Sequence, residues 1–242
     1  MKLIIPTRSR WLANPSKARI RQYNAQFARG IQPEMLVLDA GSGAAPYRDL
    51  FTRAHYETAD FAALDRKYYQ LTYVCDLNDI PVEDARFDRV VCNQVLEHVP
   101  DPAAVLREFA RVLKDDGLIL LSTSFFFHLH MKPYDFFRYT PYSLRKLFAG
   151  AGFKVEKLDW VEGYFATVGL QFFQMGRYLP RKVTGPDKSW KWWLAAPVMH
   201  TVRLGAPALA GFFYQLDRRW KYTAKGYPKN YVVIARRRPR GP

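Results

Sequence analysis

The chain has 242 residues, of which 49% are hydrophobic and 24% are charged, a composition that fits one sizeable globular core and excludes wholesale disorder. A formal net charge of +15 favours an anionic partner: a nucleic acid, an acidic lipid surface or a phosphorylated substrate. Two cysteines make no disulfide framework, so a reducing, intracellular setting is expected. No uninterrupted apolar run reaches the ~18 residues of a membrane span, and no transmembrane helix is predicted.

Residues 1–33 are basic and are predicted to contain a helix that covers the first strand. From residue 35 onward, short apolar runs alternate with amphipathic stretches, and a continuous apolar run is typical of a parallel strand buried on both faces. Strands are predicted at residues 35–39, 55–61, 71–75, 87–93, 118–122, 153–160 and 230–235. Helices are predicted at residues 47–53, 102–113 and 141–150. This alternation predicts an α/β fold with a Rossmann-like, doubly wound, mostly parallel seven-stranded sheet.

Residues 34–162 and 228–236 are predicted to form the sheet domain, and residues 163–227 a helical insertion before the last strand. The insertion is basic and aromatic: Trp190, Trp192, Trp193 and Trp220 lie in it among lysines and arginines. Three interpretations remain open. The insertion could cap a substrate pocket, rest on an anionic membrane surface through amphipathic aromatics, or bind nucleic acid by stacking.

Polar residues and glycines follow the first three predicted strands, at the edge of the sheet where such folds bind ligands. Gly41 and Gly43 come directly after the first strand and let the backbone approach a ligand closely. Asp60 ends the second strand, where an acidic side chain accepts hydrogen bonds from ribose hydroxyls. Asp76 follows the third strand, in position to accept a hydrogen bond from an adenine amine, with Leu77 beside the ring. The set predicts a nucleoside-containing cofactor.

The ordered set resembles the class I S-adenosylmethionine-dependent methyltransferases, and more narrowly the type 11-like group with a Leu-Glu-His-Val motif after the fourth strand. That motif is Leu96 to Val99 here, and the glycine-rich motif is Leu38 to Gly43. The resemblance implies S-adenosylmethionine as cofactor, with its amino-acid end near the glycine loop and its sulfonium above Asn93 and Gln94. The implied cofactor-binding residues are Asp39, Ala40, Gly41, Ser42, Gly43, Asp60, Phe61, Asp76, Leu77, Asn93 and Gln94. Ala45 replaces a third glycine common in the family, and a stiffer loop is expected there.

Methyl transfer needs an aligned nucleophile and, for a hydroxyl, removal of its proton. The residues predicted to act on the acceptor are His98, His128, Asp135 and Arg138. The last three lie in an aromatic segment after the fifth strand, which resembles a segment of methyltransferases that act on sugars or glycan precursors; a packed structural loop is the alternative. Some relatives bind a metal through Glu-His and an acid upstream. Gln94 stands at the nearest such position, and because an amide is a poor divalent ligand, no metal is predicted.

The sequence therefore predicts a methyltransferase that acts on a small-molecule, sugar or glycan, or lipid-linked acceptor, with oxygen as the expected acceptor atom. The protein is expected in the cytoplasm. If an anionic membrane surface is its partner, it is expected at the inner face of the membrane. The alternative is an RNA methyltransferase that modifies ribose or tRNA through the basic surface. Motifs for methylation of exocyclic base amines and of pyrimidine carbon are absent from the sequence. A cofactor-binding regulatory protein without catalysis is the third hypothesis.

Overall fold

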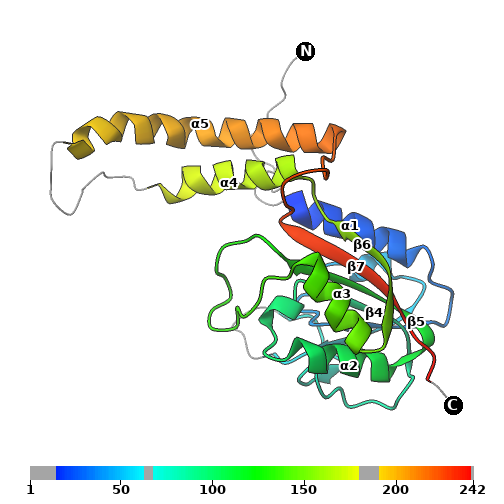
Figure 1. Ribbon diagram of the computed structural model, residues 1–242. Helices are drawn as coiled ribbons and strands as arrows, with labels where there is room; N and C mark the ends of the chain where they lie inside the picture. The colour runs from blue at the N-terminus through cyan, green and yellow to red at the C-terminus, as the bar shows by residue number, and fades with distance from the viewer. Residues whose placement is uncertain (1–14, 63–67, 180–190, 241–242) are drawn as a thin grey trace. The chain divides into compact units, whose positions relative to one another are not determined.

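The computed structural model describes residues 15–62, 68–179 and 191–240, with the side chains of residues 191–194 left out (Figure 1). Residues 1–14 of the predicted N-terminal segment, and Trp190, lie outside the described residues. Internal contacts divide the chain into two compact units. The sheet unit comprises residues 19–161 and 229–242, and the helical unit comprises residues 162–228 together with the N-terminal residues up to residue 18.

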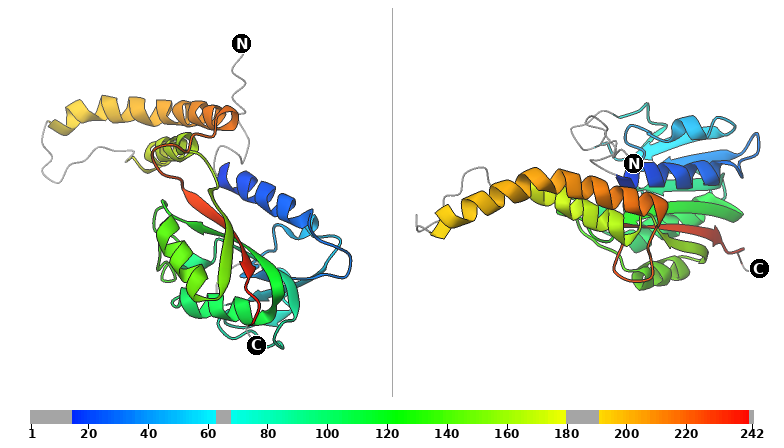
Figure 2. Two further views of the ribbon diagram at one scale, coloured as in Figure 1. Left: turned by 45° about the vertical axis from the view of Figure 1, so that its right-hand side comes forward. Right: turned by 90° about the horizontal axis from the view of Figure 1, so that it is seen from above.

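The sheet unit is built on seven strands in the order β3-β2-β1-β4-β5-β7-β6 (Figures 1 and 2). The strands are β1 (Leu36–Ala40), β2 (His55–Asp60), β3 (Tyr73–Val74), β4 (Phe87–Asn93), β5 (Leu113–Ser124), β6 (Phe153–Trp160) and β7 (Asn230–Arg237). Strand β7 runs antiparallel to both β5 and β6, and the pairs between β3, β2, β1, β4 and β5 are parallel. The predicted fold class is confirmed.

Helices cover both faces of this sheet. On one face, α1 (Pro15–Ala28) packs Ile20, Tyr23 and Phe27 against inward-facing residues of the central strands. On the other face, α2 (Pro102–Val112) and α3 (Pro141–Gly150) belong to a second buried cluster. Each of these two helices begins with a proline at its first turn and an N-cap side chain before it. Asp101 accepts a hydrogen bond from the Ala104 N–H at 2.9 Å, and Thr140 one from the Ser143 N–H at 3.1 Å.

Three predicted elements differ from the structure. The helix predicted at 47–53 is only the 3-10 turn η1 (Arg48–Leu50), which follows Ala45 in a left-handed conformation and Pro46. The third strand shrinks to two residues because only Tyr73 and Val74 pair with β2. Strand β5 begins at Leu113 rather than at residue 118, since Leu113 already pairs with Phe87 of β4. Residues 114–117, between the predicted helix and the predicted strand, therefore belong to β5.

The helical unit contains α4 (Tyr164–Tyr178) and α5 (Lys191–Arg219), which pack side by side (Figure 2). Their interface holds the buried residues Ala166, Ala210 and Tyr214. Small residues allow the close approach: a Cβ on Gly176 would lie 2.8 Å from that of Ala206. Within the described part of the chain, none of the helices has the length and apolarity needed to cross a membrane.

Candidate active site

The turn after β1 fits tightly against the segment after β4. Gly41 has a φ of 74° and Gly43 a φ of 51°, conformations that favour glycine. The N–H groups of Gly41 and Ser42 donate to the carbonyl of Ala59 on β2, at 2.8 and 3.2 Å. A Cβ added to Gly41 would collide with the Val95 side chain. Glycine is therefore required at position 41, where the backbone conformation and the contact with Val95 leave no room for a side chain.

Two polar groups of this loop bear on whether it fits the amino-acid end of S-adenosylmethionine. The Oγ of Ser42 is buried and has no hydrogen-bond partner among the described residues. Because an unpartnered buried hydroxyl costs free energy, the atom is suited to a ligand. Asp39, also buried, accepts a hydrogen bond from the Tyr56 hydroxyl at 2.5 Å. Burial, and then the charge of Asp60, raise the pKa of Asp39 to about 7. A cationic ammonium group nearby would restore its charge, so the loop fits the cofactor.

Asp60 closes the turn from the end of β2. Its Oδ2 accepts the Gly43 N–H at 2.9 Å and its Oδ1 the Ala62 N–H at 3.2 Å. Phe61, 41% exposed, lies next to it. Farther along this edge, Asp76 is exposed, and Leu77 is buried in the core. The residues predicted to hold ribose and adenine thus follow neighbouring parallel strands, although Leu77 contributes mainly to the core.

Asn93 and Gln94 are predicted to lie beneath the sulfonium; Asn93 ends β4 and Gln94 follows it. The Asn93 amide exchanges two hydrogen bonds with Asn24 of α1, each of 3.1 Å, and accepts a third from Ser122 Oγ. Gln94 has a φ of 59°, and its N–H donates to the Ser122 carbonyl. Asn93 therefore anchors α1 to the sheet edge. The sequence offered no sign of Asn24, because its partner comes from a strand 69 residues further on.

The loop between β5 and α3, residues 125–140, lies over this edge through Tyr134. The Tyr134 ring meets Phe61 edge-on, with centroids 5.6 Å apart. Asp135 and Arg138, predicted to contact the acceptor, pair with each other at 2.7 and 2.9 Å. Arg138 also donates to the carbonyls of Phe127 and His128, and this guanidinium holds the pKa of Asp135 well below its usual range. The pair ties the loop to itself.

His98 lies beneath this loop in η2 (Leu96–His98). Its Nδ1 lies 2.6 Å from the Tyr134 carbonyl, so Nδ1 carries the proton and donates it. The other nitrogen, Nε2, is buried and has no hydrogen-bond partner in the described structure. His130 stands next to it, with ring centroids 4.7 Å apart. Burial and the neighbouring His98 lower the pKa of His130, which favours its neutral form. His128 belongs to the same loop, and its ring contacts that of Phe127 at a centroid distance of 4.0 Å with a tilt of 42°.

A protein-family model described as a methyltransferase domain matches residues 14–158, which is more than half of the chain. The chain belongs to this family. It is a class I methyltransferase, and its cofactor is S-adenosylmethionine, as its motifs predicted.

Curated relatives of this methyltransferase match over shorter stretches. A ubiquinone biosynthesis O-methyltransferase of Neisseria meningitidis is 40% identical over 73 residues, which cover 28% of this chain and 29% of the relative. The enzyme of the same name from Paracidovorax citrulli is 36% identical over 101 residues, 36% of this chain and 42% of the relative. The methyltransferase thus spans less than half the length of the curated relatives it matches.

Solved structures resemble the whole fold. The phosphoethanolamine N-methyltransferase 2 of Haemonchus contortus, in complex with S-adenosylmethionine, is 15% identical with a TM-score of 0.53, over 94% of this chain and 53% of that one. The [4+2]-cyclase SpnF is also 15% identical, with a TM-score of 0.56 over 91% and 80% of the two chains. At such identity the likeness shows the fold alone, and the two names show that this fold serves different reactions.

Proposed function

We propose that this methyltransferase transfers the methyl group of S-adenosylmethionine to an oxygen atom of a small-molecule, sugar or glycan, or lipid-linked acceptor. The names of the curated relatives favour an oxygen acceptor, and the observation that carries the proposal is the state of His98. Its protonated Nδ1 is held by the Tyr134 carbonyl, and its Nε2 lone pair is buried without a partner. A neutral imidazole held in that tautomer is suited to engage a hydroxyl group.

The cofactor supplies a methyl group on a sulfonium, a strong leaving group. The acceptor oxygen forms a bond to the methyl carbon as the carbon–sulfur bond breaks, and the electron pair of that bond stays on sulfur. The hydroxyl proton leaves the acceptor toward the Nε2 side of His98. The remaining work of the protein is alignment and exclusion of water. Tyr134 contributes to both, since its ring contacts Phe61 and its carbonyl holds His98.

Residues of the loop 125–140 would form the acceptor wall. We assign Asp135 and Arg138 to positioning, because their charges are paired within the loop, and we leave His128 as a residue that faces the acceptor. The experiment that tests the function incubates the protein with radiolabelled S-adenosylmethionine and separate lipid, polar-metabolite and RNA extracts. Label in a lipid or polar fraction, stable to mild base as an ether is, is the expected result. Label in RNA alone would favour the alternative reading.

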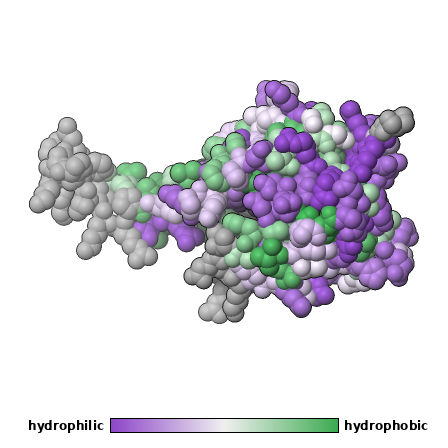
Figure 3. All heavy atoms as spheres, turned by 90° about the horizontal axis from the view of Figure 1, so that it is seen from below, coloured by the Kyte–Doolittle hydropathy of each residue, from purple (hydrophilic) through white to green (hydrophobic). Residues whose placement is uncertain are grey.

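The helical unit supports a lipid-linked acceptor or an anionic membrane surface as partner. On α5, Ala206, Ala210 and Tyr214 face α4. At 100° per residue, the side of α5 that faces away from α4 carries exposed apolar side chains. They are Val198, Leu204, Leu209 and Phe212. Basic side chains follow at the end of the helix, Arg218 and Arg219. An exposed apolar face next to cations suits the interface of an anionic bilayer. Figure 3 shows green side chains on the helical unit beside hydrophilic ones.

A further inference from the structure

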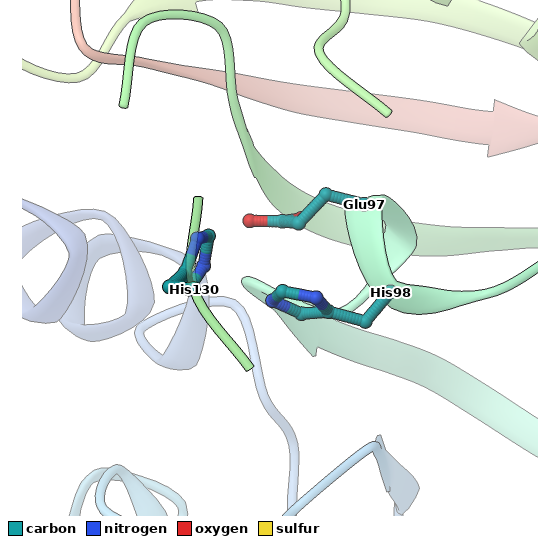
Figure 4. A group of neighbouring side chains, drawn as sticks. All are labelled: Glu97, His98 and His130. Carbon is teal, nitrogen blue, oxygen red and sulfur yellow. The ribbon is translucent and has the colours of Figure 1, made fainter. Parts of the chain in front are cut away.

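Glu97, His98 and His130 converge beside the end of β4 (Figure 4). The first two belong to η2, and His130 comes from the loop after β5. One ligand-capable atom of each lies within 4.8 Å of those of the other two. We infer that these three side chains form a site for a divalent transition-metal ion, with one carboxylate and two imidazole ligands.

Both histidines are held in the state that binds a metal. The Nδ1 of His98 donates to the Tyr134 carbonyl at 2.6 Å, and the Nδ1 of His130 lies 3.1 Å from the His128 carbonyl. A histidine ligand usually donates its second ring N–H to a carbonyl or carboxylate, which fixes the tautomer and the ring orientation. In each ring the lone pair is then on Nε2. That of His98 is buried without a partner, on a side chain only 8% exposed.

Glu97 brings a buried negative charge to the same point. It is 0% exposed, and its two carboxylate oxygens accept hydrogen bonds from Thr123 Oγ1 at 2.7 Å and Ser124 Oγ at 2.8 Å. In the described ranges, no lysine or arginine comes within 4.0 Å of these oxygens. A buried carboxylate needs a compensating cation or several strong hydrogen bonds. The Arg138 guanidinium interacts with Glu97 only from beyond that distance. A dication would bring positive charge into direct contact, and each oxygen keeps a lone pair to bind it.

The ligand set selects the class of metal. Two imidazoles and one carboxylate suit Zn²⁺, Fe²⁺ or Mn²⁺ better than Mg²⁺, which prefers oxygen ligands. At metal–ligand distances of about 2.0–2.2 Å, small side-chain rotations must draw the three atoms closer, and a fourth position stays open. Gln94, the amide because of which no metal was predicted, donates weakly toward Ser122 and is not one of the three side chains. The third ligand is His130, 32 residues along the chain from His98.

The role of the ion rests on the proposed function, although its binding does not. With its Nε2 bound to the ion, His98 would no longer take the hydroxyl proton. The cation would instead lower the pKa of an acceptor hydroxyl at the open position, and the proton would pass to water. The oxygen lone pair would then form the bond to the methyl carbon while the carbon–sulfur bond breaks, giving the methyl ether and S-adenosylhomocysteine. The metal ion bound by the Glu97 carboxylate would thus also position the acceptor oxygen.

Metal binding is tested on untagged full-length protein that has been dialysed against a chelator and then titrated with Co²⁺ and Zn²⁺. The visible absorption of Co²⁺ reports its coordination, and calorimetry reports the affinity for Zn²⁺. We expect one equivalent of each, and a loss of more than about 100-fold in affinity in His130→Ala, beyond the ~10–100-fold typical of losing an outer-shell partner. His128→Ala is the matched control, because it removes an imidazole from the same loop, outside the group of three.

Binding of S-adenosylhomocysteine to each variant shows whether it is folded. Glu97→Gln is a second variant that keeps the size of the side chain and should also lose metal affinity. The inference is overturned if the wild-type protein takes up no stoichiometric Co²⁺, or if His130→Ala and His128→Ala bind it equally. Stoichiometric metal without methyl transfer would reject the proposed function and leave the metal site standing. Methyl transfer by a protein that takes up no metal would reject the metal site and leave the proposed function standing.

Discussion

The Oδ2 atom of Asp60 accepts a hydrogen bond from the Gly43 N–H at 2.9 Å, so the end of β2 fixes the turn after β1. One carboxylate therefore shapes the loop and faces the proposed ribose site. Asp60→Ala should weaken binding of S-adenosylhomocysteine by about 1.5–3 kcal/mol, because hydrogen bonds to a charged acceptor are lost. Asp60→Asn, which keeps an acceptor oxygen for Gly43, should lose less. Calorimetry measures both, and Asp79→Asn, an exposed acid outside the site, is the control. Wild-type affinity in Asp60→Ala would reject the ribose assignment.

The raised pKa of Asp39 predicts how stability depends on pH. Its pKa is about 7 in the folded protein, against about 4 in an unfolded chain. Between these values the folded state binds the proton more tightly, so ionisation of Asp39 lowers the free energy of unfolding as pH rises through that window. Asp39→Asn, which can still accept from Tyr56, should raise that free energy by about 1–3 kcal/mol at pH 8 and change it little at pH 4.

Urea denaturation of the cofactor-free protein across this pH range measures the effect of Asp39→Asn. Glu34→Gln, an exposed acid on the same unit, is the control and should show no such difference. If the free energies of unfolding of the wild type and of Asp39→Asn change in parallel with pH, the pKa of Asp39 in the folded protein is not raised.

The ion pair inside the loop 125–140 predicts a selective loss of activity. Asp135→Ala leaves Arg138 without its carboxylate and removes the acceptor for the His130 N–H. We expect a reduced turnover or acceptor affinity, with S-adenosylhomocysteine bound as in the wild type. His128→Ala should also affect the acceptor side only. Glu156→Gln, which unpairs Arg236 at the surface of the sheet, is a matched control for loss of an ion pair. Equal losses of cofactor affinity in both loop variants would reject their assignment to the acceptor.

That the proposed cofactor residues share one edge of the sheet could be predicted, because they lie at the ends of successive parallel strands. Short apolar runs mark central strands such as β1 and the middle of β5, and Gly41, Asp60 and Asp76 lie at or just beyond the ends of β1, β2 and β3. Parallel strands bring such ends to one edge, so local patterns were sufficient. The left-handed Ala45 and the short β3 were not predicted, since strand pairing and backbone conformation there depend on neighbours.

The acceptor end could not be predicted in the same way. His130 and Tyr134 reach His98 and Phe61 only because the loop after β5 folds back over the edge of the sheet. No periodicity encodes that path. The spacing of Asp135 and Arg138 offered a hint, because residues three apart often pair, yet the sequence interpretation assigned both to a substrate. Glu97 was visible in the shared motif, but its partners Thr123 and Ser124 come from β5.

The outer face of α5 leads to the last prediction, binding to anionic vesicles. Cations near an anionic leaflet contribute roughly 1 kcal/mol each, an attraction that salt screens. Burial of apolar side chains adds about 25 cal/mol per Å², and salt does not screen it. Leu204, Phe212 and Trp220 are 67, 48 and 60% exposed. Binding should therefore weaken at high salt without disappearing.

Replacing Leu204, Phe212 and Trp220 with Ser should remove the salt-resistant part of this binding and leave the salt-sensitive part. These positions are chosen because the side chains of Trp192 and Trp193, like Trp190, lie outside the described structure. Tyr142→Ser, at an 82% exposed aromatic of α3, is the matched control and should bind as the wild type does. Co-sedimentation with anionic and neutral vesicles at low and high salt measures both parts. A nucleic-acid binder would instead ignore vesicles and release its ligand almost completely at high salt. Failure to sediment under every condition would reject the membrane partner and leave a role for the helices within the protein itself.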